Sequence, residues 1–568
     1  MQPSTYASIY SRWRGSWPLR TLTAIFALLG TWAVVCVVHG PLLHLPYYWD
    51  EAGYYVPAAY DFFRTGSLIP FSTLSNAHPP IPSLALASAW KLFGLAPLVT
   101  RLTACLASAF ALVGVWRLAR ALRCSVGVAF AVTLLTGLYP VFFAQSSLAH
   151  ADMFAAPFTV WALAYFFEER LWPAVFCFGL AALAKETTIA TPLALAAWEL
   201  WLALHSLSTR RGRNSSRNPE SLRPSHALRR SHLRASWMLL LPLLPLIGWY
   251  GYYYSQTGYI FGNPEYLHYN ATTTMVPLRI LMALFHRGLQ LTVHMNLFVP
   301  VLIALGALLL PAISAIPDKT QTRPALAAEQ LSRLWIVIAA NALFFSIFGG
   351  ALLTRYLLPI YPLVILLCVH SFWRRLRHWE LAAALTAIGF AIGLFVNPPY
   401  GFAPEDNLEY ATFIHLQQAA IDQIVTHEAH ATVLTAWPDS DALRKPILGY
   451  VKHPIAVFPI EDFTAAQIAV AAREPGRYDV ALVFSTKYEP PHWNLQLGPR
   501  DAAINREYFG AYHDLDPAQI ATILGGKIVW QEHEKGLWAA VLCFDRAEWA
   551  KTKKSDDFGS HLSIIKLT

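Results

Sequence analysis

Long apolar stretches separated by short polar ones run through the first 396 residues of the chain. A membrane-spanning helix needs about 17 to 25 mostly apolar residues, and stretches near this length recur between Thr21 and Val396. About eleven candidate spans follow from the pattern, near residues 21–39, 97–116, 126–143, 153–168, 172–184, 188–205, 237–254, 295–316, 334–350, 355–373 and 381–396. The pattern predicts a polytopic α-helical membrane protein.

The pattern changes after Asn397, where charged residues return at ordinary density. A helix is predicted over 408–428, with further helices near 464–473 and 516–524. Strands are predicted for the runs "ATVLTAW", "YDVALVF", "KIVWQ" and "WAAVLCF". We therefore predict two domains, a transmembrane domain over 1–396 and a small soluble α/β domain over 397–568.

Basic residues indicate the orientation, because Lys and Arg accumulate in cytoplasmic loops. The loop 207–236 holds eight arginines and one acid, Glu220, so it is assigned to the cytoplasm. Counting spans outward from this loop places the N-terminus inside and the C-terminal domain outside. The basic clusters around Arg117, Arg323 and Arg375 then also fall inside.

Residues 47–94 form the first external loop under this topology. The apolar run 80–93 is about fourteen residues, which as a helix would rise only about 21 Å, short of the roughly 30 Å hydrocarbon core. We expect two helices lying along the membrane surface here, an arrangement that the many Tyr and Trp residues of 47–55 favour.

Composition supports this picture. The 568 residues are 55% hydrophobic and only 14% charged, where soluble proteins have roughly 25% charged residues. The formal charge of +8 resides in loops between spans and gives no indication of nucleic-acid binding. Five of the six cysteines fall within or at the end of apolar spans, so the C-terminal domain has no disulfide framework.

Unusual polar residues converge on the outer face under this topology. They are Asp50, Glu51, His78, Asp152, Lys185, Glu186 and Arg355. Ionisable residues at membrane depth are costly and usually functional. Each has a simpler explanation: Asp50 as the cap of a helix that ends at Gly66, Lys185 and Glu186 as an interfacial ion pair, Arg355 as a snorkelling residue. Together they predict a site on the outer face.

These residues lie in motifs that resemble a known family. "WDEAGYY", "NAHPPIPSLALASAWKLFGL", "HADMF", "LAKET" and "TRYLLPIYP" are similar to the ordered motifs of type C (GT-C) glycosyltransferases, and more narrowly to bacterial relatives of protein O-mannosyltransferase and of the aminoarabinose transferase that modifies lipid A. The resemblance covers roughly residues 15–396. It implies transfer of a sugar from a polyprenyl-phosphate carrier to a hydroxyl or phosphate of a lipid, glycan or protein acceptor, on the outer face of a bacterial inner membrane.

The resemblance also implies roles for the site residues. Asp50 is the expected general base, and Glu51 and Asp152 complete the catalytic acids, with Glu51 expected to bind acceptor or steady the loop. Lys185, Arg355 and His78 are expected to bind the donor phosphate. The candidates for substrate binding are Glu186, Tyr54, Glu265 and Tyr356. Direct attack opposite the phosphate implies inversion of the anomeric carbon.

Several questions stay open at this stage. His78 stands where the aminoarabinose transferases carry Lys, and no β-trefoil repeat is visible, so neither sugar nor acceptor is fixed. A divalent metal ion remains an open possibility. His286 and His294 are about 12 Å apart along a helix, which favours an amphipathic surface helix over a metal site.

Two other functions are considered. The triplet Asp439-Ser440-Asp441 after a predicted strand could hold a metal against a nucleotide sugar, although these residues are equally suited to capping a helix. A lipid-sugar transporter or flippase would instead show charges through the middle of the bilayer and internal repeats. Neither feature is visible in the sequence.

Overall fold

The computed structural model describes residues 17–211, 223–314, 322–490 and 499–544. Helices occupy all eleven predicted span positions: α2 (Trp17–Val38), α5 (Pro97–Ala121), α6 (Val126–Leu138), α8 (Ala151–Phe167), α9 (Leu171–Ala184), α10 (Ala190–Arg211), α12 (Leu243–Thr257), α15 (Phe298–Leu308), α16 (Ala328–Ile347), α17 (Tyr361–Arg375) and α18 (Trp379–Phe395). Five helical segments of the described residues are long and apolar enough to cross a membrane. The prediction of a largely helical membrane protein is confirmed.

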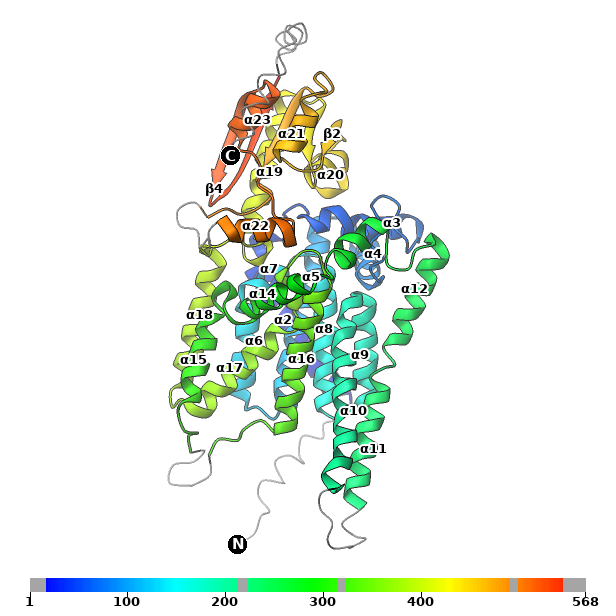
Figure 1. The fold of residues 1–568 in the computed structure, drawn as a ribbon, viewed down its shortest axis with the longest axis vertical. Coiled ribbons are helices and arrows are strands. Elements are labelled where there is room, and N and C mark those ends of the chain that lie inside the picture. The colour runs from blue at the N-terminus through cyan, green and yellow to red at the C-terminus, as the bar shows by residue number, and fades with distance from the viewer. Residues whose placement is uncertain (1–16, 212–222, 315–321, 491–498, 545–568) are drawn as a thin grey trace.

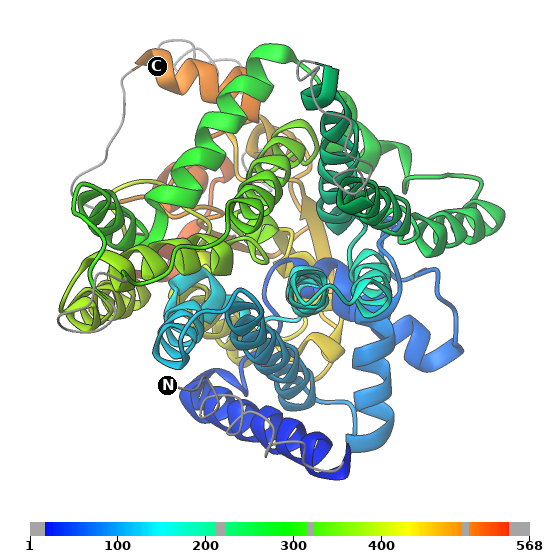
Figure 2. The ribbon, with the colours of Figure 1, turned by 90° about the horizontal axis from the view of Figure 1, so that it is seen from below.

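The helices form one bundle around a shared apolar core. Its centre is built from small and branched side chains of α5, α6, α8 and α17, among them Ala109, Val132, Leu163 and Leu366, all fully or almost fully buried. By contrast, α2 lies at the edge of the bundle (Figure 2), and only 6% of its apolar window is buried inside the protein. A helix that exposes Leu, Phe and Val in this way suits a lipid-facing position.

The segment 47–94, predicted to be the first external loop, carries two helices, as expected from its length and aromatic content. These are α3 (Val56–Thr65) and α4 (Ile81–Phe93), preceded by a π-helical turn, η2 (Glu51–Tyr55). Gly66 ends α3 in the left-handed conformation, with φ of 78°, which glycine adopts without strain. Both helices lie at the end of the bundle nearest the C-terminal sheet (Figure 1).

A five-stranded mixed sheet forms the core of the C-terminal region. The strand order is β2 (Val457–Ile460), β1 (Val433–Ala436), β3 (Val480–Phe484), β5 (Leu537–Cys543), β4 (Lys527–Glu534). The first three strands are parallel, and β5 runs antiparallel to β3 and β4. Helices α19 (Glu409–His427), α21 (Ala465–Ala471) and α23 (Pro517–Leu524) match the three predicted helices.

The C-terminal region packs directly on the segment 47–94. Trp437, at the end of β1, lies against Gly53, where an added Cβ would come within 2.5 Å of the indole ring. The same ring meets those of Trp49 and Tyr54, with centroids 5.0 and 6.0 Å away. Lys445 adds a hydrogen bond of 3.1 Å to the Ser72 carbonyl oxygen. The C-terminal region therefore contacts the segment that carries Asp50 on one side.

Candidate active site

Asp50 occupies the first position before the η2 turn, but its side chain does not cap that turn. Trp49 precedes it with φ of 39°, a strained backbone conformation for a bulky residue. Strain of this kind persists where surrounding contacts enforce it, and it is common at functional sites. The backbone here turns the Asp50 carboxylate away from its own helix and toward Arg355.

Arg355 is the centre of the site. It lies in the short helix η7 (Thr354–Leu357), and its side chain is 2% exposed. Nη2 donates to Asp50, Nη1 donates to both carboxylate oxygens of Glu405, and Nε lies 3.4 Å from Asp152 Oδ2. One guanidinium thus faces three carboxylates from three distant parts of the chain.

Lys185 supplies the second cation. It follows α9 in an extended conformation, with φ of −152°, which aims the side chain at α8. Its Nζ donates to Asp152 Oδ1 at 2.5 Å and lies 4.1 Å from the centre of the Tyr356 ring. Asp152 therefore bridges both cations, and the structure brings together four of the predicted site residues, Asp50, Asp152, Lys185 and Arg355.

Several polar atoms of this cluster lack a hydrogen-bond partner within the described protein. They are Arg355 Nε, Asp152 Oδ2 and His150 Nε2, all of them buried. Burial, with Arg355 as the largest nearby charge, lowers the pKa of His150, so the imidazole is neutral. Buried polar atoms are almost always hydrogen-bonded in proteins. Arg355 Nε and Asp152 Oδ2 face each other as an ion pair at 3.4 Å without a hydrogen bond, so both atoms keep hydrogen-bonding capacity that a polar ligand could use.

Glu51 points away from this cluster. Its side chain is fully buried, and its Oε1 accepts from Arg101 Nη1 at 2.7 Å and from the Ala149 backbone N–H at 2.5 Å. Its Oε2 accepts from the Tyr48 N–H at 2.9 Å. Arg101 also donates to the Ser147 and Pro46 carbonyl oxygens. Neighbouring acids of one helical turn thus face different partners, because successive residues point about 100° apart.

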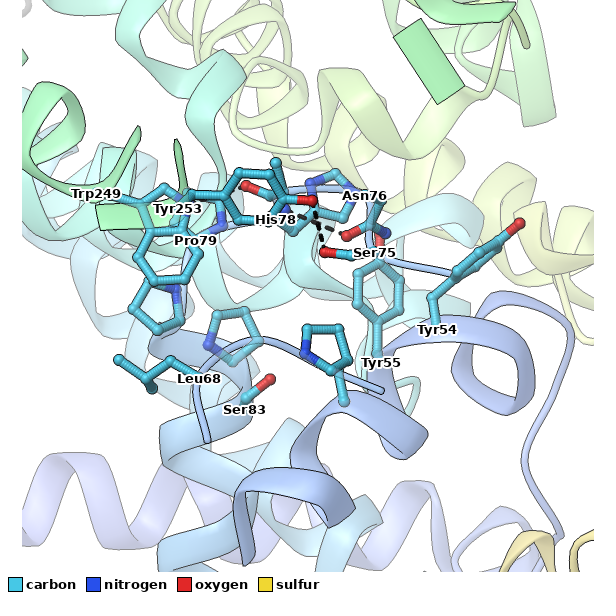
Figure 3. Close-up of a pocket in the computed structure, with 15 residues that line it drawn as sticks. Tyr54, Tyr55, Leu68, Ser75, Asn76, His78, Pro79, Ser83, Trp249 and Tyr253 are labelled. Carbon is cyan, nitrogen blue, oxygen red and sulfur yellow. Dashed lines mark hydrogen bonds between the residues drawn. The ribbon is translucent and has the colours of Figure 1, made fainter. Parts of the chain in front are cut away.

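His78 and Glu186 form a separate pair beside the cluster. His78 Nδ1 lies 3.0 Å from Glu186 Oε2, and the His78 ring stacks on Tyr55, with centroids 5.7 Å apart. Figure 3 shows His78, Tyr54 and Tyr55 around a small cavity, with Trp249 and Tyr253 on its other side. Burial, followed by the nearby Asp50 carboxylate, raises the pKa of Tyr54 to about 12. Tyr54 therefore offers a hydroxyl proton beside Asp50 at neutral pH.

A second cavity adjoins the cluster from the transmembrane side. Asp152, Lys185 and Tyr356 line it, together with Thr187 and Asn341. The two cavities measure ≈ 30 and ≈ 10 Å³, whereas small-molecule sites usually have roughly 300–1,000 Å³. The site in this conformation is closed, and a lipid-linked sugar would have to widen it.

Glu405 and Asp406 were missed in the sequence, where they were assigned to the start of the soluble domain. They lie in the short helix η8 (Pro404–Asp406), which enters the site from the segment after α18. Asp406 accepts from the Thr354 hydroxyl and pairs with His294 at 2.9 Å. Burial raises the pKa of Glu405 to about 8, an effect that Arg355 opposes. Two adjacent acids about ten residues after the last apolar span were the available signal.

The remaining candidates lie outside this cluster. Glu265 is exposed on α13 (Pro264–Leu267). His286 and His294 share no site, since His286 lies against Phe509 while His294 pairs with Asp406. The described residues contain no group of three or more His, Cys, Asp or Glu arranged to hold a metal ion.

The acid triplet of the C-terminal domain forms the first turn of α20 (Asp439–Arg444). Asp439 is fully buried, and neither carboxylate oxygen has a hydrogen-bond partner among the described residues. Burial raises its pKa well above the usual range. A neutral, enclosed carboxyl is a poor metal ligand, so the arrangement does not support a nucleotide-sugar site here.

Comparison with known proteins confirms the predicted resemblance. Residues 77–216 match the family model described as dolichyl-phosphate-mannose-protein mannosyltransferase. This segment includes His78, Asp152, Lys185 and Glu186. No curated protein sequence matches the chain significantly.

Three solved structures are similar to this chain over much of its length. ArnT from Cupriavidus metallidurans bound to undecaprenyl phosphate is 15% identical with a TM-score of 0.47, over 93% of this chain and 98% of that chain. Its apo state gives a TM-score of 0.46 at 15% identity, over 92% and 98%. The Archaeoglobus fulgidus oligosaccharyltransferase is 11% identical with a TM-score of 0.39, over 80% and 69%.

Proposed function

We propose that this chain, with its mannosyltransferase-family segment, is an inverting glycosyltransferase that takes its sugar from a polyprenyl phosphate. The observation that carries the proposal is the single cluster of Asp50, Asp152, Lys185 and Arg355. A family named for dolichyl-phosphate-mannose uses a sugar phosphodiester of this class. The acceptor is a hydroxyl or phosphate of a lipid, glycan or protein.

Lys185 and Arg355 suit the donor phosphate. When the bond between the anomeric carbon and the phosphate oxygen breaks, the electron pair stays on the phosphate, whose charge grows by one. Fixed cations that stabilise developing charge in a water-poor site lower the barrier strongly. Both cations are buried, and Arg355 Nε has no hydrogen-bond partner yet. The donor phosphate would bind Lys185 and Arg355 in place of carboxylates that pair with them in the free protein.

Asp50 suits the role of base. Its side chain is 19% exposed, against 2% for Asp152 and 3% for Glu405, so an acceptor can reach it. The acceptor oxygen attacks the anomeric carbon from the face opposite the phosphate, and its proton passes to the Asp50 carboxylate. The configuration inverts, and no covalent intermediate forms. Asp152, held between the two cations, positions them relative to the sugar.

The other predicted residues are assigned by their surroundings. Glu51 holds the loop through Arg101 and acts on structure. Tyr54 and His78 line the first cavity, which suits the acceptor or sugar, and Glu186 orients His78. Tyr356 lies beside Lys185, where the donor phosphate is expected to bind. Glu265 is exposed on α13, outside the cluster. We assign the site and the C-terminal domain to the outer face of a bacterial inner membrane, with 1–396 and 397–568 as the two domains.

The test is a transfer assay with purified full-length protein in membranes. Radiolabelled polyprenyl-phosphate sugars would be supplied with extracted envelope lipids, glycans or proteins, with and without a chelator. We expect label on an acceptor and free polyprenyl phosphate as products, and no transfer from nucleotide sugars. Movement of intact lipid-linked sugar across the bilayer, with no transfer, would identify a flippase instead.

A further inference from the structure

Glu405 places a third carboxylate on a guanidinium that must also receive a phosphate. Asp50, Asp152 and Glu405 face Arg355, and Lys185 is the only other cation paired within this set of described residues. Three carboxylates against two cations leave a formal charge of −1 when all are ionised. An anionic donor would enter a site that is already negative, at a cost that grows as water is excluded.

The three acids differ in how readily each can give up its contact with Arg355. Asp50 must stay ionised to act as base, and Asp152 is bound by both cations. Glu405 contacts one cation only, through both of its oxygens, and its side chain is 3% exposed. Its bond to Arg355 Nη1 is therefore the contact that a phosphate can replace at the least cost to the rest of the cluster.

Glu405 cannot readily swing away to make room. Gln145 Nε2 donates to its carbonyl oxygen at 3.2 Å. The next residue, Asp406, is fixed by His294 at 2.9 Å and by the Thr354 hydroxyl. These bonds fix the backbone at Glu405 and Asp406, and the Glu405 side chain is enclosed, so we expect its negative charge to be removed in place.

The geometry points to Glu405 as a counter-ion that, where it is ionised in the free protein, occupies Arg355 and takes up a proton when the donor phosphate binds. Glu405 is thus a positioning residue that acts through Arg355, and this inference rests on the function proposed above. One proton enters from solvent as the phosphodiester takes the Nη1 contact. No covalent bond changes in this step.

The surroundings of Glu405 favour its protonated form, so uptake of a proton on binding is expected above about pH 8. Burial raises the pKa of Glu405 to about 8, even with Arg355 opposing. The charged and titratable groups facing it are Arg355 from η7, Asp50 before η2, Asp152 and His150 at the start of α8, Asp406 on η8, and Tyr48. Burial lowers the pKa of His150 and raises that of Tyr48 well above 10, so neither competes for this proton.

The experiment measures binding of a short-chain polyprenyl methyl phosphodiester to the purified full chain from pH 6.5 to 9.5. A diester probe keeps one negative charge throughout, unlike a monoester whose second pKa is near 6. Below the pKa of Glu405 the acid is already neutral, whereas above it each binding event must draw a proton. We expect the Kd to be flat at low pH and to rise about tenfold per pH unit above 8.

Glu405→Gln should abolish this rise, and Glu409→Gln is the matched control. Glu409 is a buried acid four residues away that bonds Asn397 and not Arg355, so its variant should keep the parent profile. An unchanged pH dependence in Glu405→Gln would overturn the inference, as would loss of probe binding in that variant alone. Failure of the parent to bind at any pH would contradict the proposed function itself.

A second readout needs no variant and covers the case in which Glu405→Gln does not fold. Titrating the parent with probe at pH 8.5 in buffers of different ionisation enthalpy gives the number of protons taken up. We expect more than half a proton per probe bound. A value of zero would overturn the inference.

Discussion

Replacing Glu51 should lower the free energy of unfolding without removing a group that takes part in the reaction. In Glu51→Met, Arg101 keeps its charge inside the bundle with no carboxylate, and the N–H groups of Tyr48 and Ala149 lose their acceptor. Breaking a fully buried ion pair by removing one partner costs about 3–5 kcal/mol, and each stranded backbone donor adds about 1–3 kcal/mol. We expect a free energy of unfolding lowered by at least about 4 kcal/mol.

The double variant tests whether Glu51 and Arg101 stabilise the protein as a pair. Removing both charges in Glu51→Met/Arg101→Met leaves no unpaired ion, so its loss should be smaller than the sum of the two single losses by about 3 kcal/mol. The control is Glu168→Met, which breaks the ion pair between Glu168 and Arg117. Arg117 lies on α5, like Arg101, but this pair is more exposed, with side-chain exposures of 27% for Arg117 and 26% for Glu168. Exposed pairs contribute only about 0–1 kcal/mol.

The assay is thermal unfolding of the purified proteins in one detergent, followed by loss of monodisperse protein. The reasoning is refuted if Glu51→Met melts no lower than Glu168→Met, or if the single losses simply add. A Glu51→Met protein that keeps parental stability and binds donor, yet transfers no sugar, would instead place Glu51 in the chemistry.

Three further predictions concern the C-terminal domain and the donor side. Gly53→Ala should push Trp437 away from the segment 47–94, because the new Cβ would lie 2.5 Å from the indole. The protease sensitivity of the segment after α18 should therefore rise. Gly401→Ala is the control, since Gly401 has open space around it, and its protease sensitivity should stay unchanged. Asp439→Asn should stabilise the protein clearly more at pH 8 than at pH 5. Burial raises the pKa of Asp439 in the folded state, so the native state binds the proton more tightly, and the parent loses up to about 1.4 kcal/mol per pH unit as the pH rises above about 4. Equal melting shifts at both pH values would contradict this. Lys185→Met should weaken transfer at least about 10²-fold, measured as kcat/KM, with Lys91→Met on the exposed face of α4 as the control.

Hydropathy located the helices of the membrane part because each long apolar run must satisfy its backbone internally. It could not reveal Arg101 as the partner of Glu51, although a charged residue inside the predicted span 97–116 was a usable signal. Strand β2 escaped prediction because Pro459 interrupts it. The structure places β2 at the sheet edge, where a proline costs no ladder bond.

The candidate site was predicted in part for the same reason. Asp50, Asp152, Lys185 and Arg355 each stand near the end of an apolar run, and the alternation of the predicted spans alone brings these ends to one face. Glu405 comes from a segment with no such periodicity, and its approach to Arg355 depends on tertiary packing of η8 against α7 (Pro140–Gln145). Local patterns do not encode a contact between residues 50 positions apart.

The most direct test of the account is the single-turnover rate of sugar transfer in Asp50→Asn, measured with donor binding to the same protein. Asparagine keeps the size of the side chain and removes the base. The account predicts donor binding within a few-fold of the parent and a rate lower by about 10²–10⁴-fold, with inverted product in the residual activity. Transfer at the parental rate with donor bound normally would contradict it.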